Sequence, residues 1–227
     1  MRKLVVTIDG PSGAGKSTIS QLLAERLGYT YVDTGALYRL VALKVKWENC
    51  DPEDEKKLSI LSRDLDVVFE QQNGILKVFL EGVDVTEDIR TPEMSLLASQ
   101  VSAKKVVREA LLGIQRRFGD AGGIVVEGRD MGSVVFPDAE VKFFLDASLE
   151  TRCKRRDEQY RAKGKIFDPG TISREIAQRD LNDSTRSLSP LRPAEGAVVI
   201  DSTDMSIEEV VGEMLRVIQQ SLSPSPK

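Results

Sequence analysis

The chain has 227 residues, of which 41% are hydrophobic and 30% are charged, a composition typical of a globular protein. Its formal net charge is −4, which argues against a nucleic-acid or membrane surface that acts through bulk positive charge. Histidine is absent, so mechanisms that use an imidazole base are excluded. The two cysteines have neither metal nor redox spacing, and no apolar run is long enough for a membrane span. We expect a cytoplasmic monomer that binds neither nucleic acid nor membrane.

A glycine-rich loop stands between the first two predicted elements. The apolar run over residues 4–8 predicts a strand, and helical spacing over residues 19–27 predicts a helix. The loop fits G-x-x-x-x-G-K-[ST], and this context favours phosphate binding over a turn that binds nothing. We expect Lys16 to reach the β- and γ-phosphates of ATP and Ser17 to ligate Mg²⁺. The expected nucleotide-binding residues are Gly10, Pro11, Ser12, Gly13, Ala14, Gly15, Lys16, Ser17 and Thr18.

Strands and helices alternate along the rest of the chain, with one interruption. A strand at 29–32 is followed by helices at 36–46 and 51–62, the second opened by Asp51-Pro52. The interruption is antiparallel: strands at 65–69 and 75–80 flank an Asn-Gly turn at 73–74, and residues 83–85 add a third strand. Thr91-Pro92 opens a helix that runs to about 118 with a break near Ser102. The remaining predictions are strands at 124–126, 141–145 and 197–200, helices at 149–163, 171–183 and 206–222, and a disordered tail at 223–227.

This order predicts the α/β class, with a parallel sheet flanked by helices and a small antiparallel β insertion. Ligands of such sheets bind at the carboxyl ends of the strands, and polar clusters follow several strands here. One cluster covers residues 33–39 and another covers residues 127–132. Arg179, Asp183 and Arg186 are spaced to share one face of a helix if the helix continues that far. A solvated ion pair is the alternative, but the other clusters favour a second anion site.

Residues 151–165 hold seven basic side chains against two acidic ones. Arg152, Arg155 and Arg156 share a helix face by the i, i+3, i+4 rule. A wet surface helix is one interpretation of this charge. We favour a mobile helical lid that folds arginines over transferring phosphates, because two polyanions must be brought together away from water.

Taken in order, the clusters resemble those of the bacterial cytidylate kinases. The matching stretches are Thr7-Ile8-Asp9 with the loop, residues 33–39, 98–101, 107–111, 127–132, 134–139 and 144–148, Arg179-Asp180, and Asp201-Ser202-Thr203. The resemblance covers nearly the whole chain. It implies a nucleoside-monophosphate-kinase fold that transfers the γ-phosphoryl group of ATP, with Mg²⁺, to CMP or dCMP.

The resemblance also implies roles for individual residues. Arg39, Arg129 and Arg186 would hold the acceptor phosphate, with Thr34 where the family often has serine. Ser99, Arg108 and Asp130 would read the cytosine, and Arg179 with Asp183 the sugar. Separately from the resemblance, we expect Lys16, Arg129, Arg152 and Arg156 to act on the transferring group. The expected layout is a single kinase domain with a core at about 1–62, 103–150 and 184–222, a monophosphate-binding insertion at 63–102 and a lid at 151–183.

Two other functions compete with this interpretation. A nucleotide switch or binding module would share the loop, but the chain lacks an N/T-K-x-D motif, and its D-x-x-G match at 120–123 precedes a strand. A kinase for another small acceptor, such as UMP, is the second alternative. A carboxylate at Asp130 favours cytosine, whose exocyclic amine donates where uracil presents a carbonyl.

Overall fold

The computed structural model describes residues 3–63, 65–72, 75–162, 164 and 168–222. The chain forms two compact units. The sheet unit consists of Met1–Asp33 and Gln115–Lys227, and the inserted unit is Thr34–Ile114. The predicted Asn-Gly turn at 73–74 and the tail at 223–227 lie outside the described residues.

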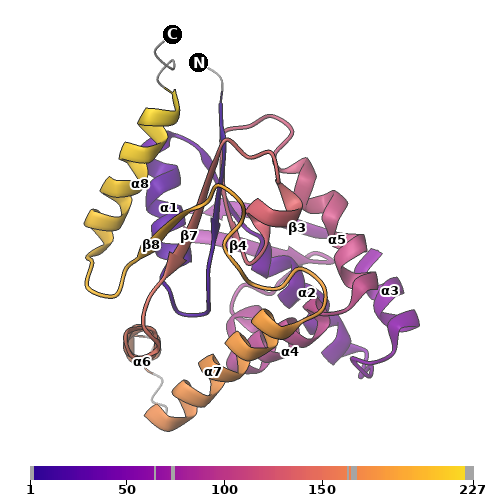
Figure 1. Cartoon of the computed structure of the whole chain (residues 1–227). Helices are drawn as coiled ribbons and strands as arrows, with labels where there is room; N and C mark the ends of the chain where they lie inside the picture. Colours follow the sequence, from indigo (N-terminus) through magenta and orange to yellow (C-terminus); the bar gives the residue numbers. More distant parts are fainter. Residues whose placement is uncertain (1–2, 64, 73–74, 163, 165–167, 223–227) are drawn as a thin grey trace. The chain divides into compact units, whose positions relative to one another are not determined.

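The sheet unit is built on five strands in the order β2-β6-β1-β7-β8, and every pairing is parallel. Strands β7 and β8 of this sheet are labelled in Figure 1, with helices α1 and α8 beside them. Such a sheet needs helical crossovers between its strands, which the alternating sequence supplies. The strands are β1 (Val5–Asp9), β2 (Thr30–Asp33), β6 (Ile124–Gly128), β7 (Val141–Asp146) and β8 (Val198–Asp201). The helical elements of this unit are α1 (Lys16–Leu27), η2 (Met131–Val135), α6 (Leu149–Ala162), α7 (Pro169–Thr185) and α8 (Ile207–Leu222).

One face of this sheet carries the hydrophobic core. Helices α1 and α8 pack there, with Leu23 and Met214 fully buried against Phe143 and Ile8. The central strands β1 and β6 are buried along almost their whole length, as expected for strands covered on both faces. Glu209 and Ser206 form the predicted capping box at the start of α8, with Ser206 N–H 2.8 Å from Glu209 Oε2.

The strand register gathers the polar clusters at one edge. Asp9 lies opposite Gly128, Asp33 lies opposite Glu127, and Asp146 lies opposite Asp201. Because all five strands are parallel, the loops that follow these residues leave the same carboxyl edge.

The inserted unit combines helices with a small antiparallel sheet. Strands β3 (Val67–Gln72), β4 (Ile75–Leu80) and β5 (Val83–Asp84) pair in sequence order. The helical elements are α2 (Thr34–Trp47), α3 (Glu55–Arg63), η1 (Asp88–Arg90), α4 (Pro92–Ser102) and most of α5 (Lys105–Arg117), which continues into the sheet unit from Gln115. The predicted break near Ser102 is confirmed, and Thr91 caps α4 by accepting from Met94 N–H at 3.2 Å.

The α/β class and the antiparallel insertion are confirmed, but one helix start was predicted wrongly and one turn was not predicted. The helix predicted at 51–62 begins at Glu55, because the Asp54 carboxylate accepts from the N–H groups of Lys56 and Lys57 at 3.1 Å and caps it there. Residues Met131–Val135 form a π-helical turn that the sequence pattern did not indicate. Helix α7 ends at Thr185, so Arg186 follows the helix as its C-cap.

Candidate active site

The glycines of the loop are required by its geometry. Gly10 has φ +152°, and a Cβ there would lie 2.0 Å from the carbonyl oxygen of Leu145. Gly13 has φ +81°, and a Cβ there would lie 3.1 Å from Arg152 Cβ. Only glycine tolerates both the left-handed backbone and the close approach of a neighbouring chain. The loop is therefore tightly held between β7 and α6.

The start of α1 is suited to an anion. Gly15 is the N-cap and provides no side-chain acceptor for the first N–H groups of the helix. Lys16 is 7% exposed, and its Nζ donates to the carbonyl oxygen of Pro11 at 2.6 Å. Burial, followed by the like charge of Arg129, lowers the pKa of Lys16 well below its ordinary value. A phosphate beside Nζ would stabilise the charged ammonium form of Lys16, which burial disfavours.

Arginines of α6 contact the backbone of the loop directly. Arg152 Nη1 donates to Ser12 O at 2.9 Å, and Arg155 Nη1 donates to Ala14 O at 3.2 Å. Arg156 Nη2 and Arg179 Nη1 lie 3.3 and 3.1 Å from Ser12 Oγ. The predicted set of lid arginines thus converges on the phosphate loop.

Asp180 and Ser202 hold these arginines in place. Asp180 accepts from Arg152 Nη1 at 2.5 Å with one oxygen and from Ser12 N–H at 3.3 Å with the other. Arg155 donates to Ser202 Oγ at 3.0 Å and to Ser202 O at 2.6 Å, which ties the loop after β8 to the phosphate loop.

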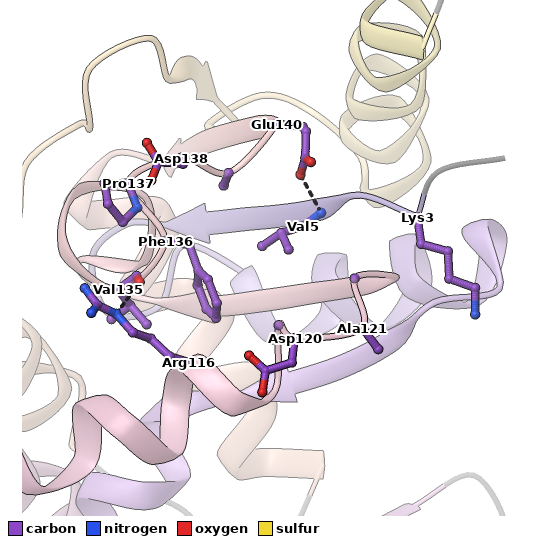
Figure 2. Close-up of a pocket in the computed structure, with 13 residues that line it drawn as sticks. Lys3, Val5, Arg116, Asp120, Ala121, Val135, Phe136, Pro137, Asp138 and Glu140 are labelled. Atoms are coloured by element: carbon purple, nitrogen blue, oxygen red, sulfur yellow. Dashed lines mark hydrogen bonds between the residues drawn. The ribbon is translucent and has the colours of Figure 1, made fainter.

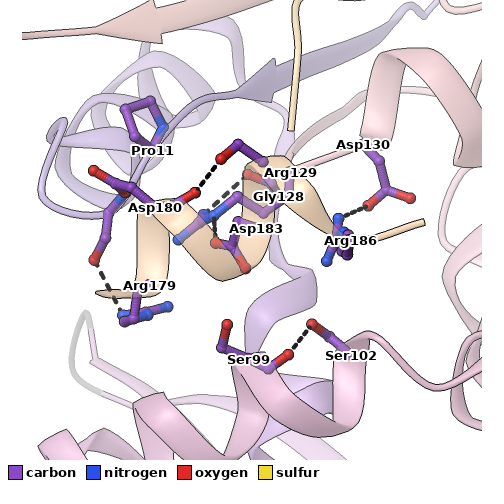
Figure 3. Close-up of polar contacts among 12 residues, drawn as sticks. Pro11, Ser99, Ser102, Gly128, Arg129, Asp130, Arg179, Asp180, Asp183 and Arg186 are labelled. Atoms are coloured by element: carbon purple, nitrogen blue, oxygen red, sulfur yellow. Dashed lines mark hydrogen bonds and ion pairs between the residues drawn. The ribbon is translucent and has the colours of Figure 1, made fainter. Parts of the chain in front are cut away.

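A second charged cluster combines Arg129 and Asp130, which follow β6, with Asp183 near the end of α7 and Arg186 at its C-cap (Figure 3). Arg129 Nε donates to Asp183 Oδ2 at 2.8 Å, and Arg186 Nη2 lies 3.8 Å from Asp130 Oδ1. Asp183, Asp130 and Arg186 are all less than 10% exposed. Although burial alone would raise it, Arg129 and then Arg179 lower the pKa of Asp183. The sheet unit therefore brings together five of the predicted acceptor residues, which are Arg129, Asp130, Arg179, Asp183 and Arg186.

Carboxylates line the strand ends beside Ser17. Glu127 is 4% exposed and accepts hydrogen bonds from the Tyr31 hydroxyl and from Ser17. Burial, followed by the charge of Asp33, raises the pKa of Glu127. These are hard oxygen donors, the type that Mg²⁺ prefers, so Ser17, Glu127 and Asp33 fit a magnesium site that is completed by phosphate oxygens and water.

The inserted unit holds the other predicted acceptor residues. Ser102 Oγ donates to Ser99 O at 2.8 Å, and Arg108 Nη1 donates to Ser102 O at 3.1 Å. The Arg108 guanidinium lies 5.7 Å from the ring centroid of Tyr38, which was not predicted as part of the site. Ser99 and Arg108 are thus linked within this unit through Ser102. Thr34 and Arg39 lie on α2, with Thr34 buried and Arg39 half-buried.

A cavity of about 670 Å³ opens at the amino ends of the strands (Figure 2). It lies between the starts of β1 and β7, at Val5 and Glu140, and beside Phe136. None of its thirteen lining residues belongs to the predicted site. Within the described part of the chain, no helix is long and apolar enough to cross a membrane.

Sequence reasoning missed contacts that join distant segments. Tyr31 and Glu127 are 96 positions apart, and Arg152 and Ser12 are 140 apart. Local spacing identifies a motif but not its partner. The available signal was that Arg179-Asp180 and Asp201-Ser202-Thr203 stand among the stretches that match the family.

Comparisons with known proteins show which family the chain belongs to. The family profile described as cytidylate kinase matches residues 6–220. A cytidylate kinase of Syntrophotalea carbinolica is 50% identical over 227 residues, covering 99% of this chain and 97% of its relative. One of Geobacter sulfurreducens is 49% identical over 225 residues, with 99% and 97% covered. A solved structure of an uncharacterized protein from Eubacterium ventriosum resembles this chain in fold alone. Its sequence is 11% identical, its TM-score is 0.50, and the match covers 96% of this chain and 99% of that protein. The chain belongs to the cytidylate kinase family.

Proposed function

We propose that the chain transfers the γ-phosphoryl group of ATP to CMP or dCMP, giving ADP and CDP or dCDP. The family match over residues 6–220, joined to a phosphate loop of the required geometry, carries this conclusion. The chain is a nucleoside monophosphate kinase, and the nucleotide-switch alternative is not favoured.

The donor phosphates would lie on the loop from Gly10 to Thr18. The free N–H groups at the start of α1 and Lys16 Nζ would bind the β- and γ-phosphates. Ser17 would ligate Mg²⁺, with Glu127 and Asp33 holding its water ligands. The ion would neutralise charge on the transferring group.

The acceptor nucleotide has its own set of proposed residues. Arg39, Arg129 and Arg186 are proposed to bind its phosphate, and Arg179 with Asp183 its sugar. The buried Asp130 would accept from the exocyclic amine of cytosine, with Ser99 and Arg108 as donors to the ring. Thr34 would add a hydroxyl. Because Asp130 is 2% exposed, a uracil carbonyl placed against it would leave an unpaired buried acceptor.

Catalysis in this site needs no protein base. The second pKa of a phosphate monoester is about 6, so the attacking oxygen is already largely deprotonated near neutral pH. The chain has no histidine, in keeping with this chemistry. Lys16, Arg129, Arg152 and Arg156 would instead align the two phosphates and stabilise the charge that shifts between them.

We further propose that residues 63–102 bind the monophosphate, that residues 151–183 act as a lid, and that the core comprises about residues 1–62, 103–150 and 184–222. Arginine contacts from α6 and α7 to the loop support the lid assignment. The chain would work as a cytoplasmic monomer on small molecules.

Product analysis tests the proposal. Incubation with ATP, Mg²⁺ and CMP should give equal amounts of ADP and CDP by anion-exchange chromatography. ADP formed without CDP would indicate hydrolysis alone and would contradict the assignment.

A further inference from the structure

The buried carboxylate of Asp9 caps the turn that carries Asp130. Asp9 is the last residue of β1 and is 2% exposed. Its Oδ1 accepts from Met131 N–H at 2.8 Å, and its Oδ2 accepts from Gly132 N–H at 2.9 Å. Both carboxylate oxygens are therefore committed to the first residues of η2.

This turn has no cap of its own. Asp130 is the N-cap residue of η2, yet its side chain makes no capping hydrogen bond. Its carbonyl oxygen accepts from Val134 and Val135 N–H at 2.9 and 3.2 Å. The backbone of Asp130 is thus fixed by η2, and η2 is fixed from β1 by Asp9. The Asp130 side chain is left to face Arg186 rather than the helix start.

Close packing strengthens the dependence of the turn on β1. A Cβ on Gly132 would lie 2.9 Å from Thr7 Oγ1 and 3.2 Å from Ala194 Cβ. Thr7 and Asp9 are two residues apart on one strand, so they face the same side of the sheet. The turn consequently lies directly on β1, and a small change at Asp9 would move it.

We infer that Asp9 is a positioning residue for acceptor specificity: by holding both N–H groups at the start of η2, it sets the orientation of the Asp130 carboxylate toward the base. This rests on the proposed function, in which Asp130 reads cytosine. Asp9 does not itself contact the substrate in this account.

Asp9 also precedes Gly10, so a general role in holding the phosphate loop must be separated from a role in base choice. A loop defect would raise the KM for ATP and lower turnover of every acceptor alike. A positioning defect would lower the ratio of kcat/KM for CMP to that for UMP.

The test is the Asp9→Asn variant of the full-length chain. Asparagine keeps one accepting oxygen but presents an amide N–H₂ to the second backbone N–H, which leaves that donor unpaired. We expect the CMP-to-UMP ratio to fall about tenfold, with the KM for ATP unchanged within about twofold.

Asp54→Asn is the matched control. Asp54 accepts from Lys56 and Lys57 N–H through a single oxygen, Oδ1, which asparagine retains. The same substitution at the start of another helix should therefore leave the ratio unchanged.

Asp130→Asn separates the inference from its premise. If this variant discriminates like the wild type, the cytosine role of Asp130 is wrong and the inference fails with it. The inference alone is overturned if Asp130→Asn loses discrimination while a folded Asp9→Asn protein keeps it. It is also overturned if Asp130→Asn loses discrimination while Asp9→Asn loses kcat/KM equally for CMP and UMP. Should Asp9→Asn not fold, Gly132→Ala displaces the same turn with Asp9 intact. It must then lower the ratio, and an unchanged ratio refutes the inference.

Discussion

At the scale of single residues, Lys16 is a buried cation whose lowered pKa shows that the fold disfavours its charge. We predict that Lys16→Ala lowers kcat by at least about 100-fold, because one preorganised donor to developing charge contributes on that order. Its thermal unfolding temperature should not fall substantially, since removal of a desolvated charge offsets the lost packing.

A coupled ADP-release assay and circular dichroism check this prediction. Lys3→Ala, which removes a lysine at the opposite edge of the sheet, is the control. Full transfer by a folded Lys16→Ala protein would contradict the proposed role.

The pH dependence of stability offers a second residue-scale prediction. Burial, opposed by the N–H groups of Gly132 and Met131, raises the pKa of Asp9 from 3.8 to about 6, with Asp130 adding to the rise and Lys16 opposing it. The folded chain holds this proton more tightly than the unfolded chain. The group therefore stabilises the fold fully below its ordinary pKa, and that contribution is lost as the pH rises through about 6.

Denaturant unfolding of the wild type and of Asp9→Asn between about pH 4 and pH 8 measures this contribution. This range covers the interval between the ordinary pKa of 3.8 and the raised pKa of about 6. We expect the free energy of unfolding of the wild type to fall relative to the variant up to about pH 6.5 and then to stay level. A difference that does not change with pH would show that Asp9 has no raised pKa.

The site residues that the sequence could predict are those within one local motif. Lys16 and Ser17 follow from the spacing of the glycine-rich loop, whose chemistry is local. Asp9 could not be assigned, because its partners lie 122 and 123 positions away and are set by strand register. A buried carboxylate acquires its role only from what the fold places beside it.

At the scale of secondary-structure elements, α6 and α7 are joined to the phosphate loop through Asp180. Its two oxygens connect Arg152 with Ser12 N–H, so it aligns an arginine of α6 with the loop. We predict that Asp180→Asn raises the KM for ATP about tenfold, the effect of weakening a charge-assisted hydrogen bond.

Steady-state kinetics with varied ATP measures this effect. Asp157→Asn is the control, because Asp157 pairs with the exposed Arg161 in an i, i+4 ion pair on α6, the helix that carries Arg152. An unchanged KM in Asp180→Asn, or an equal rise in both variants, would contradict the specific role of Asp180.

Element boundaries were predictable where capping is local. Thr91 and Ser206 cap their helices with their own side chains, and both starts agree with the sequence signals. The start of α3 was misplaced because Asp51-Pro52 and Asp54 are competing signals within four residues. The π-turn at Met131–Val135 was missed because its cap comes from another strand.

At the scale of the whole molecule, a net charge of −4 coexists with a concentration of arginines at one edge of the sheet. Alternation of strands and helices was enough to predict the parallel sheet. Composition alone could not reveal the anion site, since the basic residues are local and acidic residues elsewhere outweigh them.

Removal of the metal is a prediction for the intact protein. Excess EDTA should abolish turnover, while CMP should still bind in calorimetry, because the proposed acceptor residues include no metal ligand. Restoration of turnover by added Mg²⁺ is the control. Undiminished turnover in EDTA would contradict a metal at Ser17.

Acceptor choice decides the central claim. In a coupled ADP-release assay with ATP and Mg²⁺, we expect CMP and dCMP to have far higher kcat/KM values than UMP and AMP. Equal values for all four nucleotides would contradict the assignment of a cytosine-reading site.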